Sequence, residues 1–208
     1  LLDLPNKYND QTVIQTINDT LEGQKSQIEA NINDVEVKYR PKKNLILYVS
    51  DLTGHMQIRF LHYYPSQIKQ LESAGLVRFY GEVRQQSNYK EMIHPQYYIV
   101  NDSTELSKNL TPIYSTTKGL SQNMIRKLIK NHIESATQDK LFKELFLNFY
   151  EKYDFPSFMD SISFLHEPPK IKFKDIEAVH NSKFYKRLIY DELLAQQLFL
   201  RKQYNSLK

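Results

Sequence analysis

A strand, a helix and a second strand are predicted, in that order, by residues 55–83, which read HMQIRFLHYYPSQIKQLESAGLVRFYGEV. Apolar and polar side chains alternate over residues 55–61 and again over 77–83, the period of two that is typical of strands. Between them, Pro65 is suited to the first turn of a helix, and Gly75 is suited to the position just past its end. A short helix inserted between two strands therefore lies at the centre of the predicted fold.

Three further strands are predicted around this stretch. Apolar alternation over residues 28–37 changes phase near positions 33–34, which predicts a β-bulge. Residues 45–49 are apolar on both faces, so this strand is either covered on both sides or presents a platform at the surface. Alternation returns over residues 92–100, where Pro95 has no N–H to donate. That strand must therefore lie at an edge, or its ladder must stop at the proline.

Five strands with a helix between the third and the fourth follow the order of an OB-fold, a small Greek-key barrel that often binds nucleic acids. Another small barrel or sandwich would have strands of similar length, but the position of the helix favours the OB-fold. Helical periodicity then predicts helices over residues 121–136, 139–152 and 156–166, and a broad apolar stripe predicts a long helix over 182–204. We expect an α+β protein: a five-stranded OB-fold β-barrel over residues 24–100, followed by a helical linker region ending in a long helix.

The composition favours a polyanionic partner and excludes several other classes. The net charge of the 208 residues is only +4, but residues 38–101 carry nine Lys and Arg against four Asp and Glu. A basic β-domain is typical of nucleic-acid binding, although a merely hydrophilic surface would give the same count. The absence of Cys excludes disulfides and thiolate metal sites. No apolar run reaches the roughly 20 residues that a membrane span requires, so we expect no membrane partner.

No motif in the sequence indicates catalysis. The five Gly, at positions 23, 54, 75, 81 and 119, form no phosphate-binding loop, so we expect no cofactor in this chain. The six His show no metal-ligand spacing, and a Gly-x-Ser-x-Gly elbow is missing. We therefore expect neither catalytic residues nor a metal site.

The candidate DNA-binding residues all lie in the predicted barrel. Tyr63 and Tyr64 occupy the loop before the short helix, where an aromatic pair beside Arg59 is suited to stacking on unpaired bases. Alternation places Phe60 in the core, although it too could stack. Six basic residues of the predicted barrel are expected to contact phosphates. Four of them fall in one turn, Lys38, Arg40, Lys42 and Lys43, and the other two are Arg84 and Lys90.

Several short segments of the sequence resemble the RecG family of bacterial branched-DNA helicases. Met92-Ile-His-Pro95 is followed by Leu110-Thr-Pro-Ile-Tyr114 and a Gly-Leu helix start, in the order found in the wedge region of that family. The entry to the barrel, Pro5-x-x-Tyr8-x-Asp10, is also similar. Lys186–Leu198 resembles the helix that links the wedge to the motor.

The resemblance implies a lead-in segment over residues 1–22, an OB-fold wedge domain over 23–101, and a helical linker region over 102–208 that leads to an absent motor. It implies a parent that uses ATP and Mg²⁺ to unwind replication forks and Holliday junctions in repair and recombination, in the bacterial cytoplasm at the nucleoid. By matching, Phe60 takes the place of the first wedge aromatic, while Leu61 stands where a second Phe is common.

By itself this chain is expected to bind branched DNA without unwinding it, with the motor domains of the same protein as its other partner. The apolar stripe on residues 183–204 would favour self-association. The alternative is an OB-like protein-interaction module with no DNA role.

Overall fold

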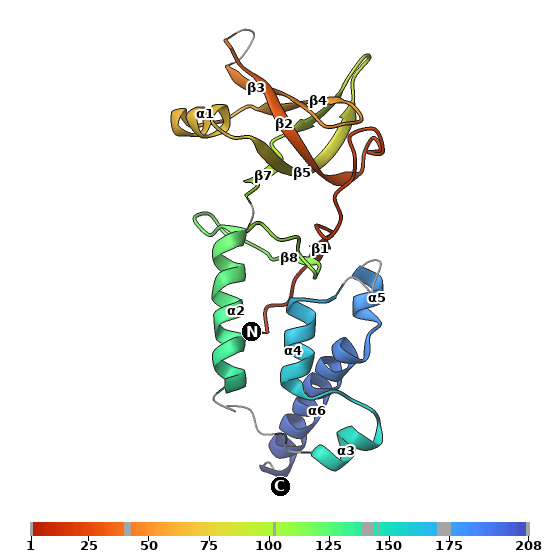
Figure 1. Ribbon diagram of the computed structural model, residues 1–208. Helices are drawn as coiled ribbons and strands as arrows, with labels where there is room; N and C mark the ends of the chain where they lie inside the picture. The colour runs from red at the N-terminus through yellow and green to blue at the C-terminus, as the bar shows by residue number, and fades with distance from the viewer. Residues whose placement is uncertain are drawn as a thin grey trace. The chain divides into compact units, whose positions relative to one another are not determined.

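The computed structural model describes residues 2–39, 43–101, 103–138, 144, 146–169 and 176–206. The chain forms two compact units. One comprises Gln11–Leu106, and the other comprises Leu1–Asp10 together with Ser107–Lys208. Figure 1 shows their elements, and each unit is described by itself below.

The first unit is a closed barrel with one helix. Its strands are β2 (Lys25–Lys38), β3 (Asn44–Ser50), β4 (His55–Phe60), β5 (Leu76–Gln85), β6 (Lys90–Ile93) and β7 (Gln96–Ile99), and α1 (Pro65–Glu72) lies between β4 and β5. Each of β2, β3 and β4 pairs antiparallel with its neighbour, β4 pairs parallel with β6, and β2 pairs with β5 to close the ring. This order, with a helix after the third barrel strand, is that of an OB-fold. The expected α+β class and the expected position of the helix are confirmed.

The last barrel strand differs from the expectation. Instead of one strand over residues 92–100, the chain forms β6 and β7, separated at His94 and Pro95, so the described sheet has six strands rather than five. A Cβ atom at Gly81 of β5 would lie 3.0 Å from the Cβ of Pro95, tighter than an ordinary contact, so the lack of a side chain there allows Pro95 to pack closely on β5. Pro95 thus ends the ladder, one of the two outcomes that its missing N–H predicts.

The β-bulge in β2 is also confirmed, because the register with β3 shifts between Ile32 and Asp34. Lys25–Asn31 pair with β5, and Asn31–Lys38 pair with β3. The bend at the bulge allows one strand of 14 residues to serve two sides of the barrel.

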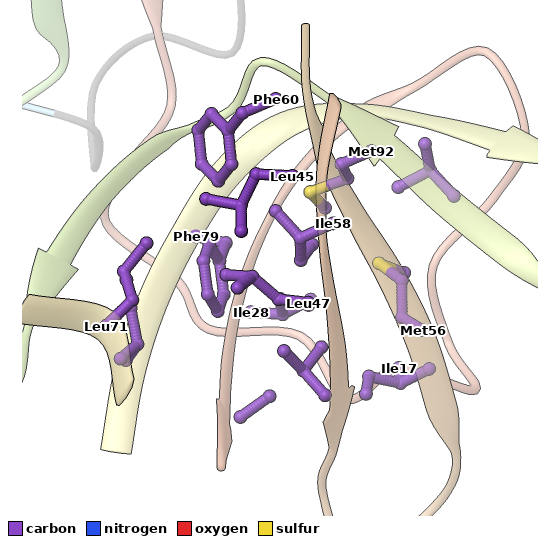
Figure 2. Close-up of a cluster of buried hydrophobic side chains, with 14 residues drawn as sticks. Ile17, Ile28, Leu45, Leu47, Met56, Ile58, Phe60, Leu71, Phe79 and Met92 are labelled. Carbon is purple, nitrogen blue, oxygen red and sulfur yellow. The ribbon is translucent and has the colours of Figure 1, made fainter. Parts of the chain in front are cut away.

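The barrel interior is an apolar cluster contributed by every long strand and by α1, as Figure 2 shows. Phe79, Leu47 and Ile58 are fully buried within it, and Leu71 attaches α1 to it. Ile17, which precedes the first barrel strand, is also part of this cluster. Its backbone N–H donates to the Asp51 carboxylate at 2.7 Å, so the segment before β2 belongs to the barrel unit.

The second unit combines a small sheet with helices. Its two-stranded sheet pairs β1 (Lys7–Asn9) with β8 (Thr111–Ile113), and its helices are α2 (Gln122–Gln138), α3 (Leu147–Lys152), α4 (Phe158–His166), α5 (Ile176–His180) and α6 (Lys183–Ser206). The predicted helices correspond to α2, α4 and α6. The helix predicted over 139–152 is shorter, because α3 begins after an N-cap at Phe146, and residues 139–143 and 145 lie outside the described residues.

A buried Arg187 joins the C-terminal helices of this unit. Its guanidinium donates to Asp191 at 2.9 Å, to Glu144 at 2.7 Å and to the Pro156 carbonyl at 2.7 Å, and it lies 3.5 Å from the centre of the Tyr150 ring. Such a cation is stable in a low-dielectric site only because both carboxylates and the carbonyl compensate it. Arg187 therefore fixes α3 and the start of α4 against α6.

Among the described residues, we find no helix with the length and hydropathy of a membrane span.

Candidate nucleic-acid interface

The loop of residues 61–64 joins β4 to α1 and presents aromatic side chains at the surface of the barrel. Tyr64 is the N-cap residue of α1, and its side chain makes no capping hydrogen bond and is 78% exposed. Tyr63 is half-buried and packs against the core, and its buried hydroxyl has no hydrogen-bond partner. Leu61 and His62 are exposed. The two tyrosines therefore differ. The exposed ring of Tyr64 is accessible for stacking on a ligand, whereas the ring of Tyr63 packs against the barrel core.

The loop borders a hollow of about 650 Å³ lined by Lys43, Leu61, His62, Tyr63, Tyr64 and Gln67. Lys43 comes from the turn between β2 and β3, and its ammonium lies 5.4 Å from the centre of the Tyr63 ring and 5.9 Å from that of Tyr39. Cation–π contacts of this length attract the ammonium to both aromatic rings. One basic residue of the predicted turn is thus brought to the aromatic loop.

The turn that carries Lys43 joins the first two barrel strands, and that loop is one of those with which OB-folds bind oligonucleotides. The ammonium of Lys38, at the end of β2, lies 3.4 Å from the Glu36 carboxylate. The hydrogen bond between these two side chains raises the pKa of the Lys38 ammonium. Part of its charge is therefore compensated within the strand. Arg40 and Lys42 lie outside the described residues.

Phe60 occupies the inner face of β4. It is 3% exposed, pairs across the ladder with Leu45, and contacts the His94 and Tyr97 rings edge-on at 5.9 and 5.8 Å. Figure 2 shows it at one end of the buried cluster, beside Leu45. In this structure Phe60 is a core residue, as the alternation of β4 predicts.

Two of the predicted basic residues make ion pairs or hydrogen bonds within the barrel. Arg59 lies 2.9 Å from the carboxylate of Glu91, which is 1% exposed. Lys90 donates to three carbonyls of the segment before β2, at 2.8–3.0 Å. Because a buried carboxylate requires its cation, Arg59 stabilises the barrel in the described structure. Lys90 also stabilises the barrel, because its ammonium binds the carbonyls of the turn before β2.

Arg84 is the most accessible of the predicted basic residues on the later strands. Its side chain is half-exposed and lies 3.6 Å from Glu82, a surface pair of little energetic weight. Within the described residues, no group of three or more His, Cys, Asp or Glu could hold a metal ion.

Two features of the site are missing from the sequence prediction. Tyr39 is 72% exposed, and the ammonium of Lys43 lies near both its ring and the ring of Tyr63. His94 accepts backbone hydrogen bonds from Leu61 and His62 of the loop. A tyrosine before a basic turn is a signal that could have suggested Tyr39, whereas no local pattern indicates the acceptor role of His94.

The chain is similar to known proteins over nearly its whole length. A family model described as the RecG wedge domain matches residues 1–136. The ATP-dependent DNA helicase RecG of Pasteurella multocida (strain Pm70) is 32% identical over 206 residues, which cover 97% of this chain and 29% of that protein. The protein of the same name from Escherichia coli (strain K12) is 29% identical over 205 residues, 95% of this chain and 29% of that protein.

A solved structure described as "Structure of RecG bound to three-way DNA junction" has a TM-score of 0.72 with 24% identity. It covers 96% of this chain and 27% of that one, and it shows that the two share a fold. The chain spans about 29% of the length of the curated relatives that it matches. Since the family model matches well over half of its residues, the chain belongs to the RecG wedge domain family.

Proposed function

We propose that this chain is the DNA-contacting wedge of an ATP-dependent helicase that unwinds branched DNA, such as replication forks and Holliday junctions, in repair and recombination. One observation carries the proposal: an exposed Tyr64, a half-buried Tyr63 and the ammonium of Lys43 line a single hollow on an OB-fold barrel. Aromatic faces for bases and a cation for the backbone are the two groups with which such barrels bind single strands.

Each group would act on a different part of the junction. Tyr64 stacks on the first unpaired base beside the duplex, and the Tyr63 ring supports it from the barrel side. Lys43 contacts the phosphate of the same strand, together with Arg40, Lys42 and, less strongly, Lys38 of the same turn. Arg84 provides a second phosphate contact. Arg59 and Lys90 contribute mainly by holding the barrel in shape.

The barrel would part strands without moving them by itself. Stacking replaces the contacts that a base loses when it leaves the duplex, which is worth about 1–3 kcal/mol per base. The force would come from motor domains of the same protein, which would also hold ATP and Mg²⁺, because no phosphate-binding loop exists in this sequence. The chain by itself should therefore bind forks and not unwind them. The cytoplasm, at the nucleoid, is the compartment that this function requires.

The experiment is a comparison of forked and linear DNA of equal length and equal charge, titrated with the 208-residue chain at several salt concentrations. We expect tighter binding to the fork, and affinities for both that fall with salt, since phosphate contacts release counterions. Equal affinity for fork and duplex would contradict the wedge. Binding that does not depend on salt, or no binding, would favour a protein-interaction module.

The exposed C-terminal half of α6 supports a proposal about the partners of the chain. Leu198, Phe199 and Leu200 are more than half exposed on this helix, together with Tyr204. We expect these exposed apolar side chains to contact the motor domains in the parent protein and to allow self-association of the 208-residue chain. Sedimentation at increasing concentration tests the second expectation, with Phe199→Lys as the variant that should stay monomeric.

A further inference from the structure

His94 connects the interrupted barrel strand to the aromatic loop. It lies between β6 and β7 and has a positive φ of 50°, which few non-glycine residues adopt. Its backbone N–H donates to the Arg59 carbonyl at 2.8 Å, so β4 holds this unusual conformation in place. Held in this way, the imidazole is directed toward the start of the loop rather than along the sheet.

The imidazole accepts two hydrogen bonds from the loop backbone. Its Nε2 atom lies 2.9 Å from the N–H of Leu61 and 3.3 Å from the N–H of His62. A backbone N–H can only donate, so Nε2 carries no proton and the proton of the neutral ring lies on Nδ1. An imidazolium has no acceptor atom, and protonation of His94 would leave both N–H groups without this partner.

Two ring contacts make the same side chain touch both the core and the surface. The His94 ring meets the buried Phe60 edge-on at 5.9 Å, and it stacks on the exposed His62 ring at 5.8 Å with an interplanar angle of 28°. The direction in which residues 61 and 62 leave β4 is therefore set by His94. Tyr63 and Tyr64 follow directly, so the position of the proposed stacking surface depends on it.

The charged and titratable groups on the segments next to His94 come from four elements. His62 stacks on it from the loop, and Arg59 of β4 is paired with Glu91 of β6. Tyr97 of β7 touches the same Phe60 ring, and burial raises the pKa of its hydroxyl. His94 itself is exposed, so protons in solution reach it without opening of the barrel.

We propose that neutral His94 is the positioning residue of the 61–64 loop, and that its protonation releases the loop and lowers the preference of the barrel for forked DNA. The second half of this inference rests on the proposed function. The first half concerns the free protein only. The two can therefore be tested separately.

The free protein is tested by NMR of the 208-residue chain, with the backbone N–H signals of Leu61 and His62 followed from about pH 8 to about pH 5. We expect both signals to shift in step with the His94 ring, and the ring nitrogen shifts to report the Nδ1-protonated form at the upper pH. In His94→Gln, whose amide oxygen accepts a hydrogen bond but does not titrate, the Leu61 signal should stay constant. A Leu61 signal that ignores the His94 titration, or that titrates equally in His94→Gln, would overturn the proposal.

The functional half is tested by the ratio of fork to duplex affinity over the same pH range. The wild-type ratio should fall by at least about fivefold as His94 is protonated, and the ratio of His94→Gln should not change with pH. His94→Ala should show the lowered ratio at every pH. His55→Gln, at the opposite end of β4, is the matched control and should behave as wild type. A wild-type ratio that does not change with pH would refute the coupling between His94 protonation and fork preference. The absence of any fork preference at about pH 8 would instead refute the proposed function. In that case the NMR titration alone would test whether His94 positions the loop.

Discussion

Replacing Tyr64 by Ala should lower fork binding without lowering the stability of the barrel. Because the side chain is 78% exposed and makes no capping hydrogen bond, its removal should change the free energy of unfolding by no more than about 0.5 kcal/mol. If Tyr64 stacks on one base, the loss is about 1–3 kcal/mol, which corresponds to a roughly 5- to 150-fold weaker fork affinity. Duplex affinity should barely change, since a paired base offers no free face.

The assay is fluorescence anisotropy with a labelled fork and a labelled duplex, combined with urea unfolding of each variant. Tyr98→Ala, an exposed tyrosine on β7 outside the hollow, is the matched control and should bind the fork as wild type does. Tyr63→Phe should also keep fork binding, because it retains the ring and removes only a hydroxyl that has no partner. Equal losses for fork and duplex in Tyr64→Ala, or no loss in either, would refute the assignment of Tyr64 as the stacking residue.

Three further predictions concern charge. Replacing the four basic residues in positions 38–43 by Ala should weaken binding to any DNA and flatten the dependence of the logarithm of affinity on the logarithm of salt; an unchanged slope would exclude phosphate contacts by this turn. Arg187→Met should lower the free energy of unfolding by about 3–5 kcal/mol in a urea titration, because it leaves the carboxylates of Glu144 and Asp191 without their cation. Burial, with the hydrogen bond to Asp191, raises the pKa of Tyr150 to about 12. Because tyrosine in the unfolded chain ionises near about pH 10, the free energy of unfolding should fall as the pH rises from about 10 to about 12, and less so in Tyr150→Phe.

Most of the barrel could be predicted because its signals are local. Alternation fixes which face of each strand is buried, and a change in its phase located the β-bulge near residues 33–34. Pro65 opens α1 for a reason that involves only its own backbone, whereas Gly75 lies beyond the Ser73 C-cap and has no positive φ, so the prediction that it ends the helix is wrong. The resemblance to the RecG family, carried by the phrases around Met92–Pro95 and Leu110–Tyr114, is confirmed by the family model.

What could not be predicted depends on contacts between distant parts of the chain. β1 and β8 are three residues each, too short to show any period, and they exist because they pair with each other. Pro95 left two outcomes open for the last barrel strand, and the close approach of Pro95 to Gly81 on β5 is a contact that the sequence does not reveal. Neither relation leaves a pattern within its own segment.

The basic residues show the same limit at the site. The net charge of the segment includes Lys43, Arg59 and Lys90 equally. Of these three residues, Lys43 contacts the aromatic loop, and the other two bind groups within the barrel. Arg59 is held by the buried Glu91, and Lys90 is held by the carbonyls of a turn about 70 residues earlier. A sequence gives the charge of a side chain, whereas its partner is decided by the fold.

The central claim is that aromatic side chains of the 61–64 loop stack on the unpaired base at a branch point. Photocrosslinking tests it most directly, with 5-iodouracil placed at the first unpaired position of a fork, irradiated with the 208-residue chain and mapped by mass spectrometry. We expect a crosslink at Tyr64, with Tyr63 as a weaker site, and loss of the main crosslink in Tyr64→Ala. Crosslinks that map outside this loop, or that form equally with 5-iodouracil inside a duplex, would contradict it.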